Sequence, residues 1–151
     1  MSAAFKRRLA AIVAALWWGS LTTLGALVVP LLFKRMDTPA EAGALAAQLF
    51  SAQTWVSAAC GVFLMMLLNP RSAASEGTID ASQRLMLGCI VAGLLCALLV
   101  EFAVAPQIVN ARASGGSLRW WHGLGSAMFV GQWACSALVL WQLGKHKPAS
   151  A

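Results

Sequence analysis

Three polar residues stand out within otherwise apolar stretches of this sequence: Glu101, His122 and Ser126. A carboxylate, an imidazole and a hydroxyl that meet inside a membrane can bind a cation or pass a proton. His122 and Ser126 are four residues apart, so they share one face of a helix. The three predict a candidate polar or ion site if their helices pack side by side. Two alternatives remain: the three satisfy one another's hydrogen bonds, or Glu101 lies near the membrane surface and pairs with Arg112 or Arg119.

Cysteine side chains offer a second chemistry, the binding of a soft metal. Cys60, Cys96 and Cys135 lie in different apolar stretches at similar expected depths, and thiolates suit Cu(I). The sequence has no Cys-x-x-Cys motif, and cysteine also packs as a small apolar residue. Metal binding is therefore an alternative, and haem is disfavoured because the second histidine, His146, lies in the charged tail. We predict no cofactor.

Composition places the chain in a membrane. Of 151 residues, 60% are hydrophobic and 11% are charged, whereas about a quarter of the residues in soluble domains are charged. The eleven Lys and Arg residues outnumber the five Asp and Glu residues, but they form short clusters between apolar stretches, which is typical of topology signals and not of a nucleic-acid surface. Catalytic motifs such as a phosphate-binding glycine loop or a metalloprotease helix are not visible. We therefore expect no enzymatic activity and no nucleic-acid partner.

Four apolar stretches are long enough to cross a bilayer as helices, at about 9–33, 45–68, 85–106 and 118–143. The second helix is predicted to begin earlier, at Pro39, because Thr38 and Glu41 have the spacing of a capping box. Pro106 is expected to bend or end the third helix, because proline lacks a backbone N–H. The prediction is a single all-α domain over residues 1–151, a four-transmembrane-helix bundle.

The distribution of basic residues predicts that both termini are cytoplasmic. Seven Lys and Arg residues fall in the N-terminal segment, the second loop and the C-terminal tail, against four in the first and third loops. Basic residues near the ends of spans favour the cytoplasmic side.

Small residues recur at every fourth position in the first and fourth stretches. Such stripes let helix backbones approach closely in lipid. We predict that six of them pack the helices together: Ala15, Gly19, Thr23, Gly123, Ala127 and Gly131.

Trp17 and Trp18 lie too deep in the first stretch for an interfacial position. We expect them to pack in the core, with their N–H groups bonded to polar residues of other helices, since a buried tryptophan usually finds such a partner. Gln53, Thr54 and Gln132 are the expected partners.

Short motifs along nearly the whole chain add a family resemblance. They are Trp18-Gly19-Ser20, Pro30-Leu31-Leu32-Phe33, Ala42-Gly43, Phe50, Pro106, Arg112, and the pair His122 and Ser126. With these motifs the chain resembles the bacterial four-span membrane proteins of domain of unknown function 4149, which are similar to transmembrane protein 205. A more distant similarity links it to CopD-type copper-resistance membrane domains. The pair Trp120-Trp121 before His122 departs from the family's spacing of aromatic residues.

The resemblance implies a four-helix domain in the bacterial cytoplasmic (inner) membrane, and no assigned activity. We expect a non-enzymatic accessory or stress-linked membrane component. The alternative is a small oligomeric transporter, coupled to protons or handling a metal such as copper, with Glu101 and His122 as its polar centre. The expected partners are the lipid bilayer and either further copies of the chain or other membrane proteins.

Overall fold

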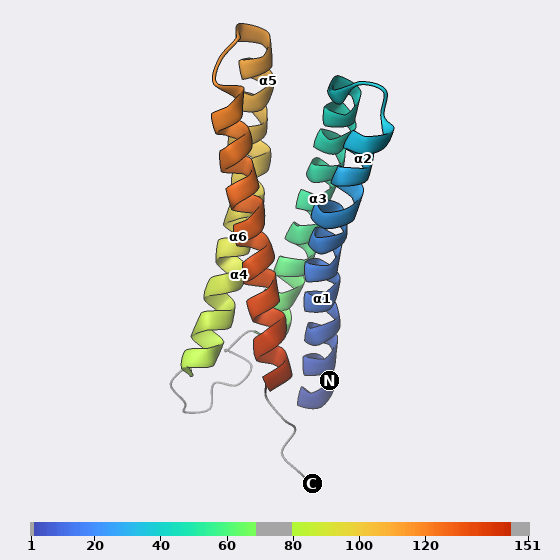
Figure 1. The fold of residues 1–151 in the computed structure, drawn as a ribbon. Coiled ribbons are helices and arrows are strands. Elements are labelled where there is room, and N and C mark those ends of the chain that lie inside the picture. Colours follow the sequence, from blue (N-terminus) through green and yellow to red (C-terminus); the bar gives the residue numbers. More distant parts are fainter. Residues whose placement is uncertain (1, 69–79, 146–151) are drawn as a thin grey trace.

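The computed structural model describes residues 2–68 and 80–145, and these form four long helical rods (Figure 1). The first rod comprises α1 (Ala3–Thr23), the π-helical segment η1 (Leu24–Val28) and α2 (Val29–Arg35). The second is α3 (Pro39–Leu67). The third comprises α4 (Ala81–Leu99), the π-helical segment η3 (Val100–Val104) and α5 (Ala105–Ser114), and the fourth is α6 (Leu118–Lys145). The all-α prediction is confirmed for the described residues.

All four rods are long and apolar enough to cross a membrane, with lengths of 28 to 34 residues. At a rise of about 1.5 Å per residue they exceed the roughly 30 Å hydrocarbon layer. Each rod therefore extends beyond the lipid at one or both ends. The chain is a multi-pass membrane protein in contact with the lipid bilayer.

Local sequence signals explain several helix ends. The Thr38 hydroxyl accepts a hydrogen bond from the Glu41 backbone N–H at 3.2 Å and donates one to the Glu41 carboxylate at 3.0 Å, so the predicted start at Pro39 is confirmed. Gly115 follows α5 with a φ of 72°, a left-handed conformation that glycine adopts without a steric penalty. The sequence also predicts that Asn69-Pro70 ends the second helix, and these two residues lie outside the described ones.

The two prolines within rods do not end them. A proline ring clashes with the carbonyl of the residue four positions earlier, which is Ala26 for Pro30 and Phe102 for Pro106. In both rods that carbonyl lies in a π-helical segment, whose wider turn replaces the α-helical bond that proline cannot make. The sequence predicts that Pro106 bends or ends the third helix, and the second of these outcomes is wrong, because this rod runs on to Ser114.

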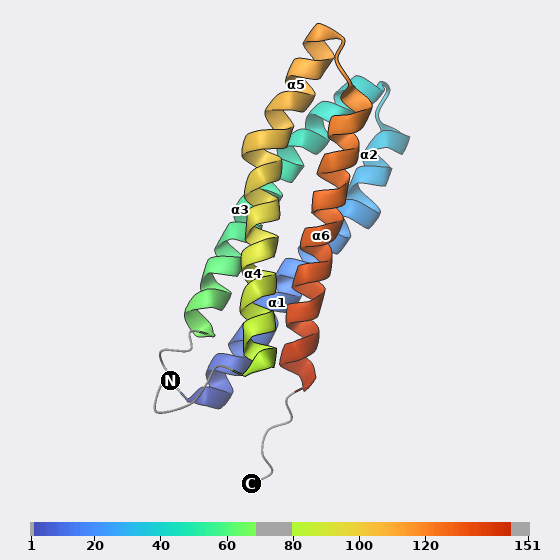
Figure 2. The same cartoon turned by 90° about the vertical axis from the view of Figure 1, so that its left-hand side faces the viewer.

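The rods pack as a four-membered ring, in which α3 and α6 each contact both α1 and α4 (Figures 1 and 2). Buried apolar side chains form a core cluster in the half of the bundle nearer the first residues of α1 and the last of α6. On α1 this inner face is Ala10, Ala14, Trp17 and Leu21. Toward the opposite end, where α2 has no buried residue, the α1–α3 and α4–α6 hairpins diverge in Figure 1.

The two hairpins repeat one another in sequence and structure. The segment η3 and Pro106 lie 76 residues after η1 and Pro30. The series Phe, Gln and Ser at positions 50, 53 and 57 of α3 returns 79 residues later at positions 129, 132 and 136 of α6. Two similar hairpins with the same chain direction therefore face each other, as in membrane proteins built from parallel repeats.

The predicted small-residue stripes lie mostly on the outside of the bundle. Ala15, Thr23, Gly123 and Ala127 are exposed, and a Cβ added to Gly19 or Gly123 would meet no atom within 4 Å. Gly131 alone approaches a neighbour, at 3.9 Å from the Cys96 sulfur. The prediction that these residues pack the four helices together is therefore wrong for the first stripe and for most of the second.

Other glycines provide the close approaches. A Cβ on Gly25 would lie 2.8 Å from the Phe129 ring, one on Gly61 would lie 2.5 Å from Leu94, and one on Gly93 would lie 2.8 Å from the Trp17 ring. In that order, the three contacts join η1 to α6, α3 to α4, and α4 to α1.

Candidate functional site

A layer of polar side chains lies between α1, α3 and α6. We call it the polar layer, and its members are the half-buried Ser20 and the buried Gln53, Ser57, Gln132 and Ser136. The Gln132 amide nitrogen donates to the Ser57 hydroxyl at 2.6 Å, and the Gln53 amide nitrogen donates to the Ser20 hydroxyl at 2.9 Å and more weakly to Ser57 at 3.4 Å. Ser57 and Ser136 are fully buried. Hydrogen bonds between helices thus offset the cost of placing these groups in an apolar interior.

Aromatic side chains close the polar layer on both sides along the bundle axis. Phe50 of α3 and Phe129 of α6 meet edge to face with ring centroids 5.3 Å apart. They lie about one helical turn from Gln53 and Gln132, toward the divergent end of the bundle. On the other side, the Trp17 ring of α1 reaches across to Gly93 of α4. The polar layer therefore lies between these aromatic side chains, and Ser20, at its edge, lines a pocket on the outside of the bundle with Gly19 and Thr23.

The tryptophan prediction is confirmed in part. Trp17 is fully buried in the core. The Nε1 atoms of Trp17 and Trp18 are also buried, but they have no hydrogen-bond partner among the described residues. The expected pairing with Gln53, Thr54 or Gln132 is wrong, because neither indole N–H reaches an acceptor on these side chains.

Glu101 lies in η3 and contacts α3. Its carboxylate accepts a hydrogen bond from the Ser51 hydroxyl of α3 at 2.6 Å, and the pair is partly buried. Ser51 is about 3 Å from Gln53 along the helix, but residues two apart point to different sides of a helix, so the pair is separate from the polar layer. On its own rod Glu101 stands between Arg84 and Arg112, eleven residues from the nearer one, which corresponds to about 16 Å.

This position is deeper than the sequence suggested. Because the rod continues through Pro106, Glu101 is more than two helical turns from the rod's end at Ser114. Among residues 2–68 and 80–145, no ion pair joins its carboxylate to Arg112 or Arg119. The Arg112 guanidinium instead approaches the backbone of α3 at Gly43, where an added Cβ would lie 2.9 Å away.

The predicted group of Glu101, His122 and Ser126 is not assembled. His122 and Ser126 are exposed on α6, away from the face that carries Gln132, Ser136, Val139 and Leu143. Within the described part of the chain, no hydrogen bond joins either residue to Glu101. The partner of Glu101 is Ser51, a residue that the sequence prediction did not include.

The cysteines do not form the predicted metal site. Cys60, Cys89 and Cys135 lie in or against the apolar core cluster, and all four cysteines are free thiols. Across the described ranges, no group of three or more His, Cys, Asp or Glu side chains is arranged to hold a metal ion. The candidate set Cys60, Cys96 and Cys135 therefore has no geometric support.

The signal for the polar layer was present in the sequence. The pattern Phe-x-x-Gln-x-x-x-Ser occurs at residues 50–57 and again at 129–136. A search for internal repeats finds such patterns, and polar residues at equivalent positions of two spans indicate a shared interface. Ser20 and Ser51 carry no comparable signal, because isolated serines are common in membrane helices.

Comparison with known proteins gives one family. The model of a family described as a domain of unknown function (DUF4149) matches residues 12–117. No curated protein and no solved structure gives a match to the chain.

Proposed function

The chain belongs to the DUF4149 family, and from that premise we propose that it is a non-enzymatic membrane component whose activity depends on proton binding at Glu101. The observation that carries the proposal is the Glu101–Ser51 hydrogen bond of 2.6 Å within a span. An ionisable group at this depth is costly enough to indicate a function.

The partner of Glu101 favours reversible protonation. An arginine at hydrogen-bonding distance would hold the carboxylate in its charged form. A serine hydroxyl both donates and accepts, so it can donate to the ionised carboxylate and accept from the protonated acid. Ser51 therefore stabilises either state, as a proton-exchanging site requires.

The repeated hairpins favour a second, more specific candidate, a small proton-coupled transporter. In transporters built from repeats, substrate and coupling-ion sites lie near the bilayer midplane where the repeats meet. Here Gln53 and Gln132, which are equivalent in the two hairpins, both donate to Ser57, and Glu101 is bonded to Ser51 of the same helix α3. The polar groups of such a transporter would be Glu101 and these two glutamines, in place of the predicted pair with His122.

The cellular setting is part of the proposal. We place the protein in the bacterial cytoplasmic membrane as an accessory or stress-linked component, with both termini cytoplasmic. The described ends of α1 and α6 lie together, since the Arg7 guanidinium donates to the Leu143 carbonyl at 3.0 Å, and the excess of basic residues there supports a cytoplasmic position. Reproducible substrate turnover by the purified protein would refute the non-enzymatic assignment.

Infrared difference spectroscopy of the protein in lipid at two pH values tests the proton site. The wild type should show a carboxylic-acid carbonyl band that appears on acidification. Glu101→Gln should remove this band, Ser51→Ala should shift it, and the control Asp37→Asn, at an exposed position, should leave it unchanged. A band that persists unaltered in Glu101→Gln contradicts the proposal.

A further inference from the structure

A groove between α1 and α6 lies near the end of the bundle that carries the first residues of α1 and the last of α6. It has a volume of about 650 Å³ and is lined by Trp18, Ala137, Leu140, Trp141, Gly144 and Lys145. Five of these residues lie on one face of α6, and the distance from Ala137 to Lys145 along the helix is about 12 Å. The groove is therefore largely apolar, runs along the lipid-facing surface of α6, and has the Lys145 ammonium at one end.

The position of the cation is defined by a neighbouring ring. The Lys145 ammonium lies over the Trp141 ring, 5.4 Å from its centroid, a distance typical of a cation–π contact. Trp141 is 64% exposed, as expected of an aromatic residue at a membrane interface. Gly144 leaves space beside the ammonium, because a Cβ there would meet no atom within 4 Å.

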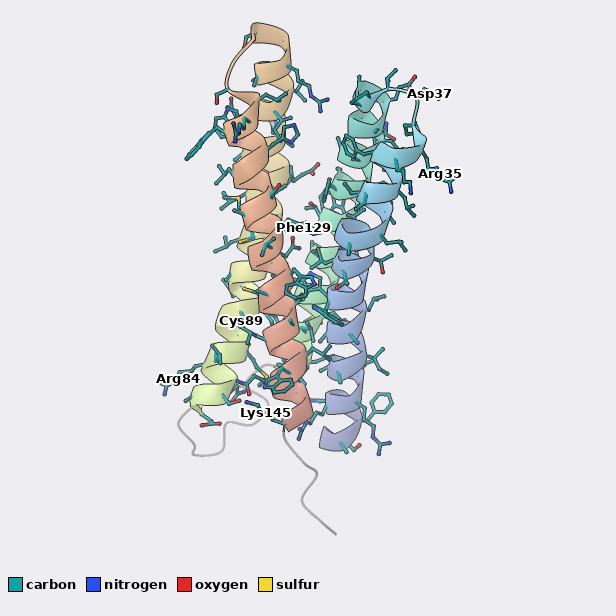
Figure 3. The ribbon with its side chains drawn as sticks, viewed as in Figure 1. Arg35, Asp37, Arg84, Cys89, Phe129 and Lys145 are labelled. Carbon is teal, nitrogen blue, oxygen red and sulfur yellow. The ribbon has the colours of Figure 1, made fainter. Side chains whose placement is uncertain are left out.

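Charge around the groove favours an anion. At this end of the bundle the described residues include five basic side chains and one acidic one: Lys6, Arg7, Arg8, Arg84, Lys145 and Asp80. Figure 3 shows Arg84 and Lys145 at this end, and Arg35 and Asp37 at the other. The opposite end has four basic and two acidic side chains: Lys34, Arg35, Arg112, Arg119, Asp37 and Glu41. A negatively charged ligand is therefore attracted more strongly to the end with the groove.

We propose that the groove binds an anionic phospholipid, with its phosphate at Lys145 and an acyl chain along Leu140 and Ala137 toward Trp18. The apolar wall accepts the hydrocarbon, and the ammonium selects the charged headgroup. A zwitterionic lipid of the same chain length gains the apolar contacts but less from the cation. This site is separate from Glu101 and does not depend on its protonation.

Native mass spectrometry of the full chain in detergent tests the proposal with phosphatidylglycerol and phosphatidylcholine of identical acyl chains. One basic residue near a membrane surface contributes about a fivefold change in affinity for an anionic lipid. Lys145→Gln should therefore weaken phosphatidylglycerol binding about fivefold and leave phosphatidylcholine nearly unchanged. Gly144→Leu should fill the groove and displace phosphatidylglycerol without disturbing the fold, since nothing occupies that space.

A matched control and four outcomes that would overturn the proposal complete the test. Lys34→Gln, at the opposite end, should leave lipid binding unchanged. Equal retention of the two lipids by the wild type, or unchanged phosphatidylglycerol binding in both groove variants, overturns the proposal. Displacement of the lipid by inorganic phosphate alone would assign the site to a free anion. If Gly144→Leu abolishes a dimer and leaves lipid binding intact, the groove would be assigned to a second copy of the chain. Either result also overturns it.

Discussion

The contact between Trp17 and Gly93 makes the packing of the bundle testable at one position. A Cβ added to Gly93 would lie 2.8 Å and 3.0 Å from two atoms of the Trp17 ring, and 3.5 Å from the Cβ of Cys135. Trp17 is fully buried in the core, so its ring cannot move aside without displacing other core residues. Overpacking of this kind typically costs about 1–3 kcal/mol.

Helix propensity acts in the opposite direction. Alanine is favoured over glycine in a helix by about 1 kcal/mol. We therefore expect Gly93→Ala to lower the free energy of unfolding by up to about 2 kcal/mol. The matched control is Gly88→Ala on the same helix, where an added Cβ meets nothing within 4 Å, and this variant should be neutral or slightly stabilised.

Reversible unfolding in mixed detergent micelles, followed by circular dichroism, measures both variants. Trp17→Phe in the Gly93→Ala background should recover part of the loss, because the smaller ring leaves space for the new methyl group. A double-mutant cycle should then show a coupling of about 1 kcal/mol. If Gly93→Ala and Gly88→Ala have the same effect, or if the coupling is absent, the packing described for Trp17 is wrong.

Two further predictions concern hydrogen bonds. Gln132→Leu and Ser57→Ala should each destabilise the bundle in the same unfolding assay. The coupling between the two variants should be about 0.6 kcal/mol, and about 1.7 kcal/mol is the upper bound for a hydrogen bond between membrane helices. Additive effects would contradict the 2.6 Å bond between the two side chains. Thr38→Ala should lower the free energy of unfolding by about 0.5–2 kcal/mol, because the N-terminal cap of α3 is lost. Thr38→Ser retains the hydroxyl and should therefore keep most of the wild-type stability. Equal free energies of unfolding for the two variants would contradict the capping role.

The rods themselves followed from long uncharged stretches, because lipid leaves a spanning chain few options other than a helix. The start of α3 was equally predictable, since Thr38 and Glu41 satisfy backbone donors locally. Such features depend on residues close in sequence. They need no knowledge of which helices become neighbours.

The inner face of each rod was harder to predict. In an alanine- and glycine-rich span, small residues occur on several faces, so the stripe at Ala15 and Gly19 was indistinguishable by spacing from the inner face at Ala10 and Ala14. The difference is made by Trp17, whose ring fills the space opposite Gly93. That pairing joins residues of different hairpins and depends on tertiary packing.

The candidate site was predicted in part for a similar reason. Glu101 was singled out because a carboxylate in a span is unusual, but the shallow position considered for it depended on Pro106 ending the helix, which it does not do. The π-helical turn that lets the rod continue brings Glu101 beside Ser51. His122 is exposed because it lies in the half of α6 before Gln132, where the hairpins diverge and no α6 residue is buried.

The account depends most on the claim that Glu101 exchanges a proton within the span. Carbon-13 NMR of the labelled glutamate carboxyl groups in lipid nanodiscs measures this directly, because Glu101 can be assigned by the loss of its signal in Glu101→Gln. We expect this signal to change with pH while the protein remains folded, and Ser51→Ala to alter that response. A Glu101 signal that stays at the position of one protonation state at every pH where the protein remains folded would contradict it.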